Sequence, residues 1–162
     1  MGGIDIEALA GSQFKSDDSE SNGSSIAFIA EYNGKRAILT GDAHPSVLSD
    51  SLKAIRSDND DEKLNVDVLK VSHHGSKANL NTDIFEHIDC SCYLISTNGK
   101  RHKHPNPEAI ARIIKFANKP TELIFNYRTK YTEIWDNRTW QQNYNYTVKF
   151  LDNVDGENVI AV

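Results

Sequence analysis

This sequence of 162 residues has no long apolar run, only two cysteines, and fewer basic than acidic side chains (18 Lys and Arg against 23 Asp and Glu). No apolar stretch approaches the roughly 20 residues of a membrane-spanning helix, and the first residues lack the basic-then-apolar pattern of a signal peptide. The net charge of -5 argues against a broad basic surface that binds nucleic acid. We therefore expect a soluble, cytoplasmic protein without membrane contact. A phosphoester substrate remains compatible with this charge, because a bound divalent cation supplies local positive charge.

The chain contains two cysteines, Cys90 and Cys92. They lie two residues apart on a predicted strand, so both side chains would point to the same face, and such pairs rarely have disulfide geometry. We expect reduced, partly buried structural thiols, which are typical of the cytosol.

The apolar content of 38% suffices for one core, and no break in composition divides the chain. Residues 1–162 are therefore expected to form a single domain. The segment 1–22 is rich in Ser, Asp, Glu and Gly, and we expect it to be a loop or a flexible lead-in.

Hydrophobic periodicity predicts strands at 25–32 and 35–40, with Asn33-Gly34 as the hairpin turn between them. A helix follows Pro45, with Val47, Leu48, Leu52 and Ile55 on one side, and a second helix starts at Asn106-Pro107. Further strands are expected at 66–71, 92–96, 123–127, 146–151 and 159–162. The region 134–140 holds two Trp residues, and the pattern leaves its structure open. This order predicts an α/β fold, a mixed β-sheet with flanking helices.

Metal-binding residue types follow two of the predicted strands at the point where each ends. Asp42 comes directly after Gly41, and His73-His74 follow the strand 66–71. Taken alone, Asp42 also fits a turn or helix cap, and the His pair fits a surface loop. Because neighbouring strand ends of an α/β sheet meet at one edge, we favour a shared site.

A third strand end, Ser96 to Pro105, adds His102 and His104. His102 lies between Arg101 and Lys103, which would repel a cation, so we expect it to be solvated. His104 precedes a helix start, where the positive dipole end favours neutral imidazole. Neutral imidazole is the form that binds a metal or contacts a leaving group. Lys70, on a strand expected to be buried, should pair with a carboxylate or line the site.

Four segments together resemble the second half of the metallo-β-lactamase-fold hydrolases, in a group similar to the competence protein ComEC. They are Asn22-Gly23-Ser24-Ser25, Leu39-Thr40-Gly41-Asp42-Ala43, Asp67 through Ser76, and Ser96-Thr97-Asn98-Gly99 through His104-Pro105. The resemblance covers about Ser21 to Ala117, and its Gly-Asp followed by His-His-Gly-Ser is fairly specific.

The resemblance implies half of an αββα sandwich and a divalent metal, usually zinc and sometimes manganese, that activates water. Asp42 would be the bridging metal ligand. His73, favoured over His74, would complete one metal site, and His74 and His104 are the expected catalytic residues. His104 would contact the substrate or bind metal. Asn106 stands where the family often has a second His.

The family's first half carries His-x-His-x-Asp-His, and these 162 residues contain no such run. The chain therefore reads as a fragment, a split protein or an inactive remnant of a hydrolase that acts on a phosphodiester or related ester. We expect an N-terminal half or a homo-oligomer to cover its open sheet. The alternative is a non-catalytic scaffold that retains the fold. A third function, binding of nucleic acid by stacking bases on the aromatic stretch 127–140, is disfavoured by the negative net charge of the chain.

Overall fold

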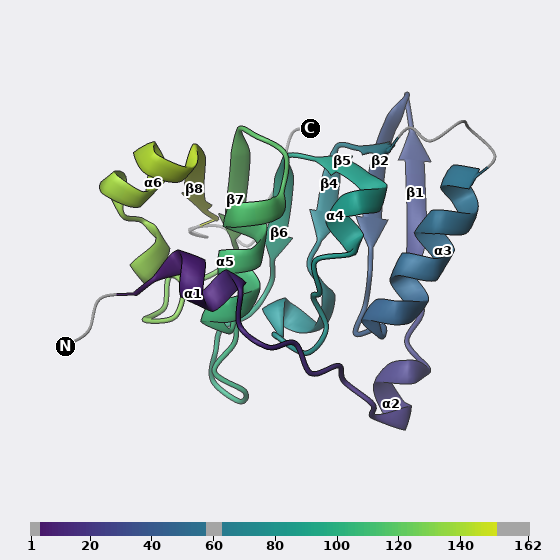
Figure 1. Ribbon diagram of the computed structural model, residues 1–162, viewed down its shortest axis with the longest axis horizontal. Coiled ribbons are helices and arrows are strands. Elements are labelled where there is room, and N and C mark those ends of the chain that lie inside the picture. Colours follow the sequence, from purple (N-terminus) through teal and green to yellow (C-terminus); the bar gives the residue numbers. More distant parts are fainter. Residues whose placement is uncertain (1–3, 58–62, 152–162) are drawn as a thin grey trace.

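The computed structural model describes residues 4–57 and 63–151 of the chain, and a six-stranded sheet forms its centre (Figure 1). The strand order is β1-β2-β4-β6-β7-β8. These strands are β1 (Phe28–Tyr32), β2 (Lys35–Leu39), β4 (Val68–Lys70), β6 (Cys92–Ile95), β7 (Thr121–Phe125) and β8 (Tyr146–Phe150). Only β1 and β2 pair antiparallel, and every other neighbouring pair is parallel. The expected α/β class with a mixed sheet and flanking helices is therefore confirmed.

The hairpin between β1 and β2 turns at Asn33-Gly34, as the sequence predicts. Asn33 has φ of 49° and Gly34 has φ of 75°. Both values lie in the left-handed region that a two-residue hairpin turn requires, and Asn and Gly are the residues that adopt it most readily. The turn leaves β1 at the edge of the sheet, with one side of its backbone unpaired in the sheet.

The predicted strand at 66–71 is divided between two sheets. β3 (Leu64–Val66) pairs with β5 (Ile88–Cys90) in a separate two-stranded sheet, and β4 starts after Asp67. Asp67 is fixed by β2, because its carboxylate accepts hydrogen bonds from the Arg36 backbone N–H (2.8 Å) and from Lys35 Nζ (2.9 Å). The expectation of one uninterrupted strand was wrong at this residue.

The same division separates the two cysteines, since Cys90 ends β5 and Cys92 begins β6. They were expected on one strand, which is wrong. Both are free and buried, as predicted for structural thiols.

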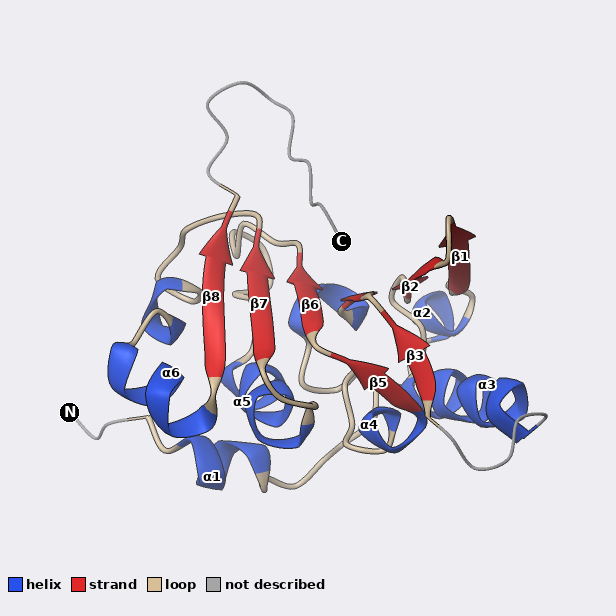
Figure 2. Cartoon of the chain, turned by 90° about the horizontal axis from the view of Figure 1, so that it is seen from above, coloured by secondary structure: helices blue, strands red, loops and turns tan. Residues whose placement is uncertain are grey.

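The principal helices lie on one face of the sheet (Figures 1 and 2). They are α1 (Ile6–Ala10), α3 (Pro45–Ser57), α4 (Ile84–His87) and α5 (Pro107–Phe116). On α5, Ile110, Ile113 and Ile114 are fully buried, as their spacing predicts. On α3, Leu48 and Leu52 are buried, whereas Val47 and Ile55 from the same predicted stripe are exposed.

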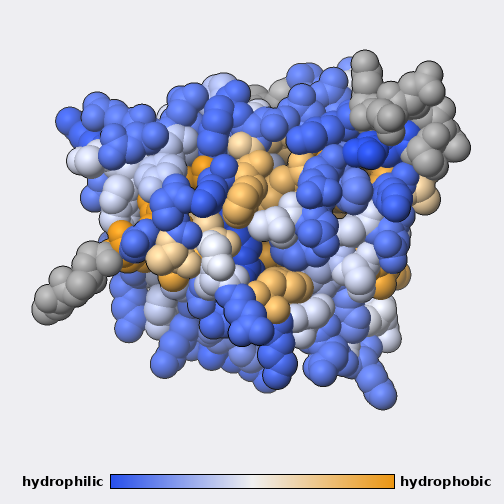
Figure 3. Space-filling view, in the orientation of Figure 1, coloured by the Kyte–Doolittle hydropathy of each residue, from blue (hydrophilic) through white to orange (hydrophobic). Residues whose placement is uncertain are grey.

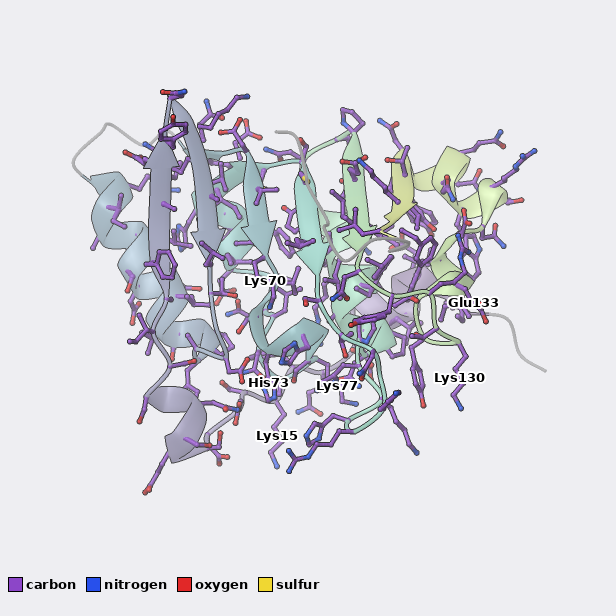
Figure 4. The ribbon with its side chains drawn as sticks, turned by 180° about the vertical axis from the view of Figure 1, so that it is seen from behind. Lys15, Lys70, His73, Lys77, Lys130 and Glu133 are labelled. Atoms are coloured by element: carbon purple, nitrogen blue, oxygen red, sulfur yellow. The ribbon has the colours of Figure 1, made fainter. Side chains whose placement is uncertain are left out.

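The core fills the space between this face and the helices. Its fully buried members on neighbouring strands include Leu69, Tyr93 and Leu123, which the strand register aligns in one row. The register aligns a second row on the opposite face, where Phe28 is exposed and Leu39, Lys70 and Leu94 are partly exposed. The view from behind shows no described helix over this second face (Figure 4).

The segment expected to be a loop, residues 1–22, contains structure in its described part. α1 buries Ile6 and Ala10, and the Asp5 carboxylate caps it by accepting from the Ala8 backbone N–H (3.0 Å). Residues 11–19 then run below the strands to α2 (Glu20–Gly23), and we call this segment the amino-terminal strap. Tertiary contacts that composition alone does not reveal hold this polar segment in place.

The region 134–140, left open by the sequence, contains the 3-10 helix η2 (Glu133–Trp135) and the start of α6 (Arg138–Tyr144). Trp135 is fully buried, and its ring centroid lies 6.1 Å from that of Trp140. On β8, Tyr146 is buried and Val148 and Phe150 are partly buried, whereas Thr147 and Lys149 are exposed, as the alternation predicts. The strand expected at 159–162 lies outside the described residues.

Exposed large apolar side chains concentrate near β1 and α3. Over the described residues, this group comprises Ile26, Phe28, Tyr32, Val47 and Ile55. Figure 3 shows apolar surface at the edge of the molecule where these two elements lie. No helix within residues 4–57 and 63–151 is long and apolar enough to cross a membrane.

Candidate functional site

The loops that follow β2, β4 and β6 come together at the carboxyl ends of these parallel strands. They carry Asp42, His73, His74 and His104, which we call the strand-end cluster. Backbone hydrogen bonds join the loops, because His73 N donates to Gly41 O (3.0 Å) and Asn106 N donates to Gly75 O (2.9 Å). Figure 4 shows His73 below the end of β4, beyond Lys70.

The tandem histidines have an unusual backbone. They lie in the 3-10 segment η1 (Ser72–Gly75), with φ of 44° at His73 and 57° at His74. Left-handed conformations cost non-glycine residues free energy and concentrate at functional sites. Gly75 continues the turn at φ of 83°, and a Cβ there would lie 2.7 Å from Pro105 Cβ. Only glycine therefore fits between the two loops at this position.

The imidazole rings of the cluster are close neighbours. The ring centroids of His73 and His104 lie 5.5 Å apart, and those of His73 and His74 lie 6.2 Å apart. His102, expected to be solvated, is exposed and stacks on His104 with centroids 5.8 Å apart.

His104 is neutral in this environment. Burial, and then the neighbouring His73, His102 and His74, lower its pKa to about 4, against the opposing charge of Asp42. Its Nδ1 atom is buried and has no hydrogen-bond partner among the described residues. A neutral ring with an unsatisfied nitrogen is suited to bind a ligand or exchange a proton.

Hydrogen bonds orient the other two rings. His74 Nδ1 lies 2.6 Å from Ser96 O, a carbonyl that only accepts, so this nitrogen carries the hydrogen in the neutral ring. His73 Nδ1 lies 2.9 Å from Asn79 Oδ1. When Nδ1–H donates, Nε2 keeps its lone pair, which is the arrangement of metal-binding and proton-accepting histidines.

Lys70 was expected to pair with a carboxylate or line the site, and among the described residues its Nζ bonds to a backbone carbonyl and not to a carboxylate. Its Nζ donates to Val71 O (2.9 Å), and burial lowers its pKa while the Asp42 charge opposes that shift. Asp42 therefore acts electrostatically on both Lys70 and His104. Its backbone is fixed, because its N–H donates to Ser25 Oγ (2.9 Å).

Sequence reasoning missed two residues next to the cluster: Asp17, which is partly buried, and Asn79, which is buried. The Asp17 carboxylate lies 3.6 Å from His73 Nδ1 and accepts from Asn79 Nδ2 (2.9 Å). Although burial opposes the shift, hydrogen bonds from Asn22, Ser19 and Asn79 hold the pKa of Asp17 well below its usual range. The one signal available was the Asn22-Gly23-Ser24-Ser25 segment, whose Asn22 contacts Asp17.

The spacing of one pair of rings can be compared with that of a metal site. Rings that share one zinc ion have centroids roughly 5 Å apart, given Zn–N bonds of about 2.0–2.1 Å. The His73 and His104 rings, at 5.5 Å, are close to that spacing. Within residues 4–57 and 63–151, however, no group of three or more His, Cys, Asp or Glu side chains is placed to hold an ion. The donor set is thus short of the three protein ligands usual for catalytic zinc.

Comparisons with known proteins add no assignment to this geometry: no family model, curated protein or solved structure matches the chain. The resemblance to metallo-β-lactamase-fold hydrolases therefore remains a prediction carried by the sequence motifs.

Proposed function

We propose that the chain forms one part of a metal-dependent hydrolase that acts on a phosphodiester or related ester. The observation that carries the proposal is that the His73, His74 and His104 rings lie together at the ends of parallel strands, where the charge of Asp42 acts on His104. Carboxylates and imidazoles are the groups that zinc and manganese bind. The preference for a phosphoester comes from the ComEC-like motifs.

Each residue of the cluster has a role in this proposal. A bound divalent metal would supply water of lowered pKa. Asp42 and His73 are the proposed metal ligands. His104 remains neutral near pH 7 because of its lowered pKa, so its free nitrogen can accept a hydrogen bond or a proton at the substrate. His74, oriented by Ser96 O, presents its Nε2 lone pair for a second proton transfer.

The incomplete donor set leads to a second part of the proposal, a covering partner. The sheet face that carries Phe28, Leu39 and Leu94 has no described helix over it. A sheet from an N-terminal half, or from a second copy of the chain, would bury this apolar face and bring further ligands to the cluster. The isolated chain should then bind metal weakly and show little or no turnover.

One observation favours a different function, a non-catalytic scaffold. The described residues hold no group of three or more potential metal ligands in binding positions, while exposed apolar side chains gather at β1 and α3. A docking module requires exposed apolar side chains such as those at β1 and α3, and it does not require the strand-end cluster. Metal affinity therefore separates the two functions.

The test is calorimetric titration of the chain with Zn²⁺ and, separately, Mn²⁺. We expect a dissociation constant in the micromolar range or weaker for the unaltered chain. Asp42→Ala and His73→Ala should each weaken binding roughly tenfold or more, because each removes one ligand from a small set.

Asp50→Ala and His87→Ala are the matched controls. Asp50 is exposed on α3 and His87 lies at the end of α4, outside the cluster. Neither substitution should change the affinity. Absence of metal binding in the unaltered chain, or equal binding by Asp42→Ala, would rule out the hydrolase proposal and leave the scaffold.

A further inference from the structure

Asn79 is a buried polar residue, 2% exposed, and its amide group is fully engaged. Its Nδ2 donates to Asp17 Oδ2 (2.9 Å) and to the backbone O of Asp42 (3.3 Å). Its Oδ1 lies 2.9 Å from His73 Nδ1. Asn79 thus connects the amino-terminal strap and the loop after β2 with the first of the tandem histidines.

The two acceptors fix which way the Asn79 amide points. A carboxylate and a backbone carbonyl offer no hydrogen, so the NH₂ group of Asn79 must face both of them. The Oδ1 atom must then face His73. Because Oδ1 only accepts, His73 Nδ1 must carry the hydrogen, and the lone pair of the neutral ring is left on Nε2.

Asp17 is itself held in position to impose this orientation. Its carboxylate accepts from the Ser19 backbone N–H (3.0 Å) and from Asn22 Nδ2 (2.5 Å), and its own backbone N–H donates to Ala78 O (3.0 Å). Asn22 Nδ2 also lies 3.3 Å from His73 Nδ1. That distance is longer than the 2.9 Å between His73 Nδ1 and Asn79 Oδ1, so Asn79 is the closer partner of His73 Nδ1.

From this geometry we infer that Asp17 and Asn79 form a positioning pair that holds His73 as the Nδ1–H tautomer. Neither residue contacts a substrate, and both act through the imidazole. The use made of the Nε2 lone pair rests on the proposed function, whereas the tautomer itself does not. Such partners behind a histidine fix its ring and raise its basicity.

The experiment is a long-range ¹H–¹⁵N correlation spectrum of the ¹⁵N-labelled full chain, recorded without metal. At pH 8 the spectrum distinguishes, in a neutral imidazole, the nitrogen that carries hydrogen from the one that does not. In the unaltered chain, His73 should be almost entirely in the Nδ1–H form. In Asp17→Asn, the amide at position 17 can donate or accept, so only the longer contact with the Asp42 backbone O (3.3 Å) still orients Asn79, and the tautomer ratio should fall roughly tenfold.

Asp18→Asn is the matched control, because Asp18 is an exposed neighbour of the same charge. It should leave the His73 signals unchanged. An Nε2–H tautomer of His73 in the unaltered chain overturns the inference. This measurement does not depend on whether a variant folds. An unchanged ratio in folded Asp17→Asn overturns the role of Asp17.

The outcome is separable from that of the metal titration. A chain that binds no metal but shows the Nδ1–H tautomer and its dependence on Asp17 would refute the hydrolase proposal and leave the positioning pair standing. A chain that binds metal through Asp42 but holds His73 as Nε2–H would do the reverse.

Discussion

Cys90 and Cys92 illustrate how strongly the core acts on a single side chain. Cys90 Sγ donates to Cys92 O (3.3 Å), and burial raises the pKa of Cys90 to about 12 and that of Cys92 to about 11. The thiolate is the nucleophilic form, and a raised pKa leaves very little of it at neutral pH. These cysteines are structural and not reactive groups.

We predict slow alkylation of both thiols by iodoacetamide at pH 8 in the folded chain and rapid alkylation in urea. Because the thiolate fraction of each folded thiol rises about tenfold per pH unit below its pKa, the folded rate should climb through pH 9 and 10. Mass spectrometry of timed samples measures it. Rapid labelling of Cys90 at pH 8 under native conditions would contradict the burial described above.

At the same scale, sequence reasoning found part of the strand-end cluster and missed what lies behind it. Asp42, His73 and His104 were found because each follows a predicted strand, a local pattern. Asp17 and Asn79 were missed because their importance arises from contacts across the fold. Asp17 lies in a polar run that resembles many loops, and nothing local shows that its carboxylate contacts His73 and Asn79.

Among the elements, α5 connects the strap to the rest of the molecule through Arg112. This side chain is 2% exposed, and its guanidinium donates to Lys77 O (2.7 Å), Leu80 O (2.9 Å) and Ser12 O (3.5 Å). It also lies 5.2 Å from the ring centroid of Phe14. The planar guanidinium thereby joins α5, the strap and the loop before α4.

Arg112→Lys should lower the free energy of unfolding by about 2–3 kcal/mol, because a lysine ammonium cannot reach all three carbonyls and leaves buried acceptors unsatisfied. The midpoint of urea unfolding measures this change. Arg56→Lys is the control, since Arg56 donates to Glu86 O (2.8 Å) at an exposed position. Equal midpoints of urea unfolding for the two variants would show that the hydrogen bonds of Arg112 do not stabilise the fold more than those of Arg56.

The elements themselves were largely predictable, with failures at their junctions. The Asn33-Gly34 turn, α3 and α5 carry strong local signals of turn chemistry and periodicity. The break at Asp67 was not predictable, because it depends on Lys35 and Arg36 of a different strand. The short helix α1 was hidden in a polar lead-in, and its formation depends on packing against α5.

At the scale of the whole molecule, the second face of the sheet is the surface through which we expect the chain to contact other chains. On edge strand β1, Phe28 and Tyr32 belong to this face and are 53% and 79% exposed. Apolar surface beside an unpaired strand edge favours association.

We predict self-association that increases with concentration in analytical ultracentrifugation, and its loss in Phe28→Lys, which places a charge on this face. Ile55→Lys provides the comparison, because Ile55 is similarly exposed but lies on α3, on the helix side. A monomer at all concentrations, or association abolished by Ile55→Lys alone, would point away from the second sheet face.

The parallel arrangement of β2, β4 and β6 also governs when the strand-end cluster comes into existence. Parallel neighbours are joined by long crossovers, so Asp17, Asp42, His73 and His104 meet only after several distant segments have closed. A chain emerging from the ribosome would lack this arrangement until the loop bearing His104 had been synthesised. No excised peptide could reproduce it, and any chemistry of these side chains belongs to the completed fold alone.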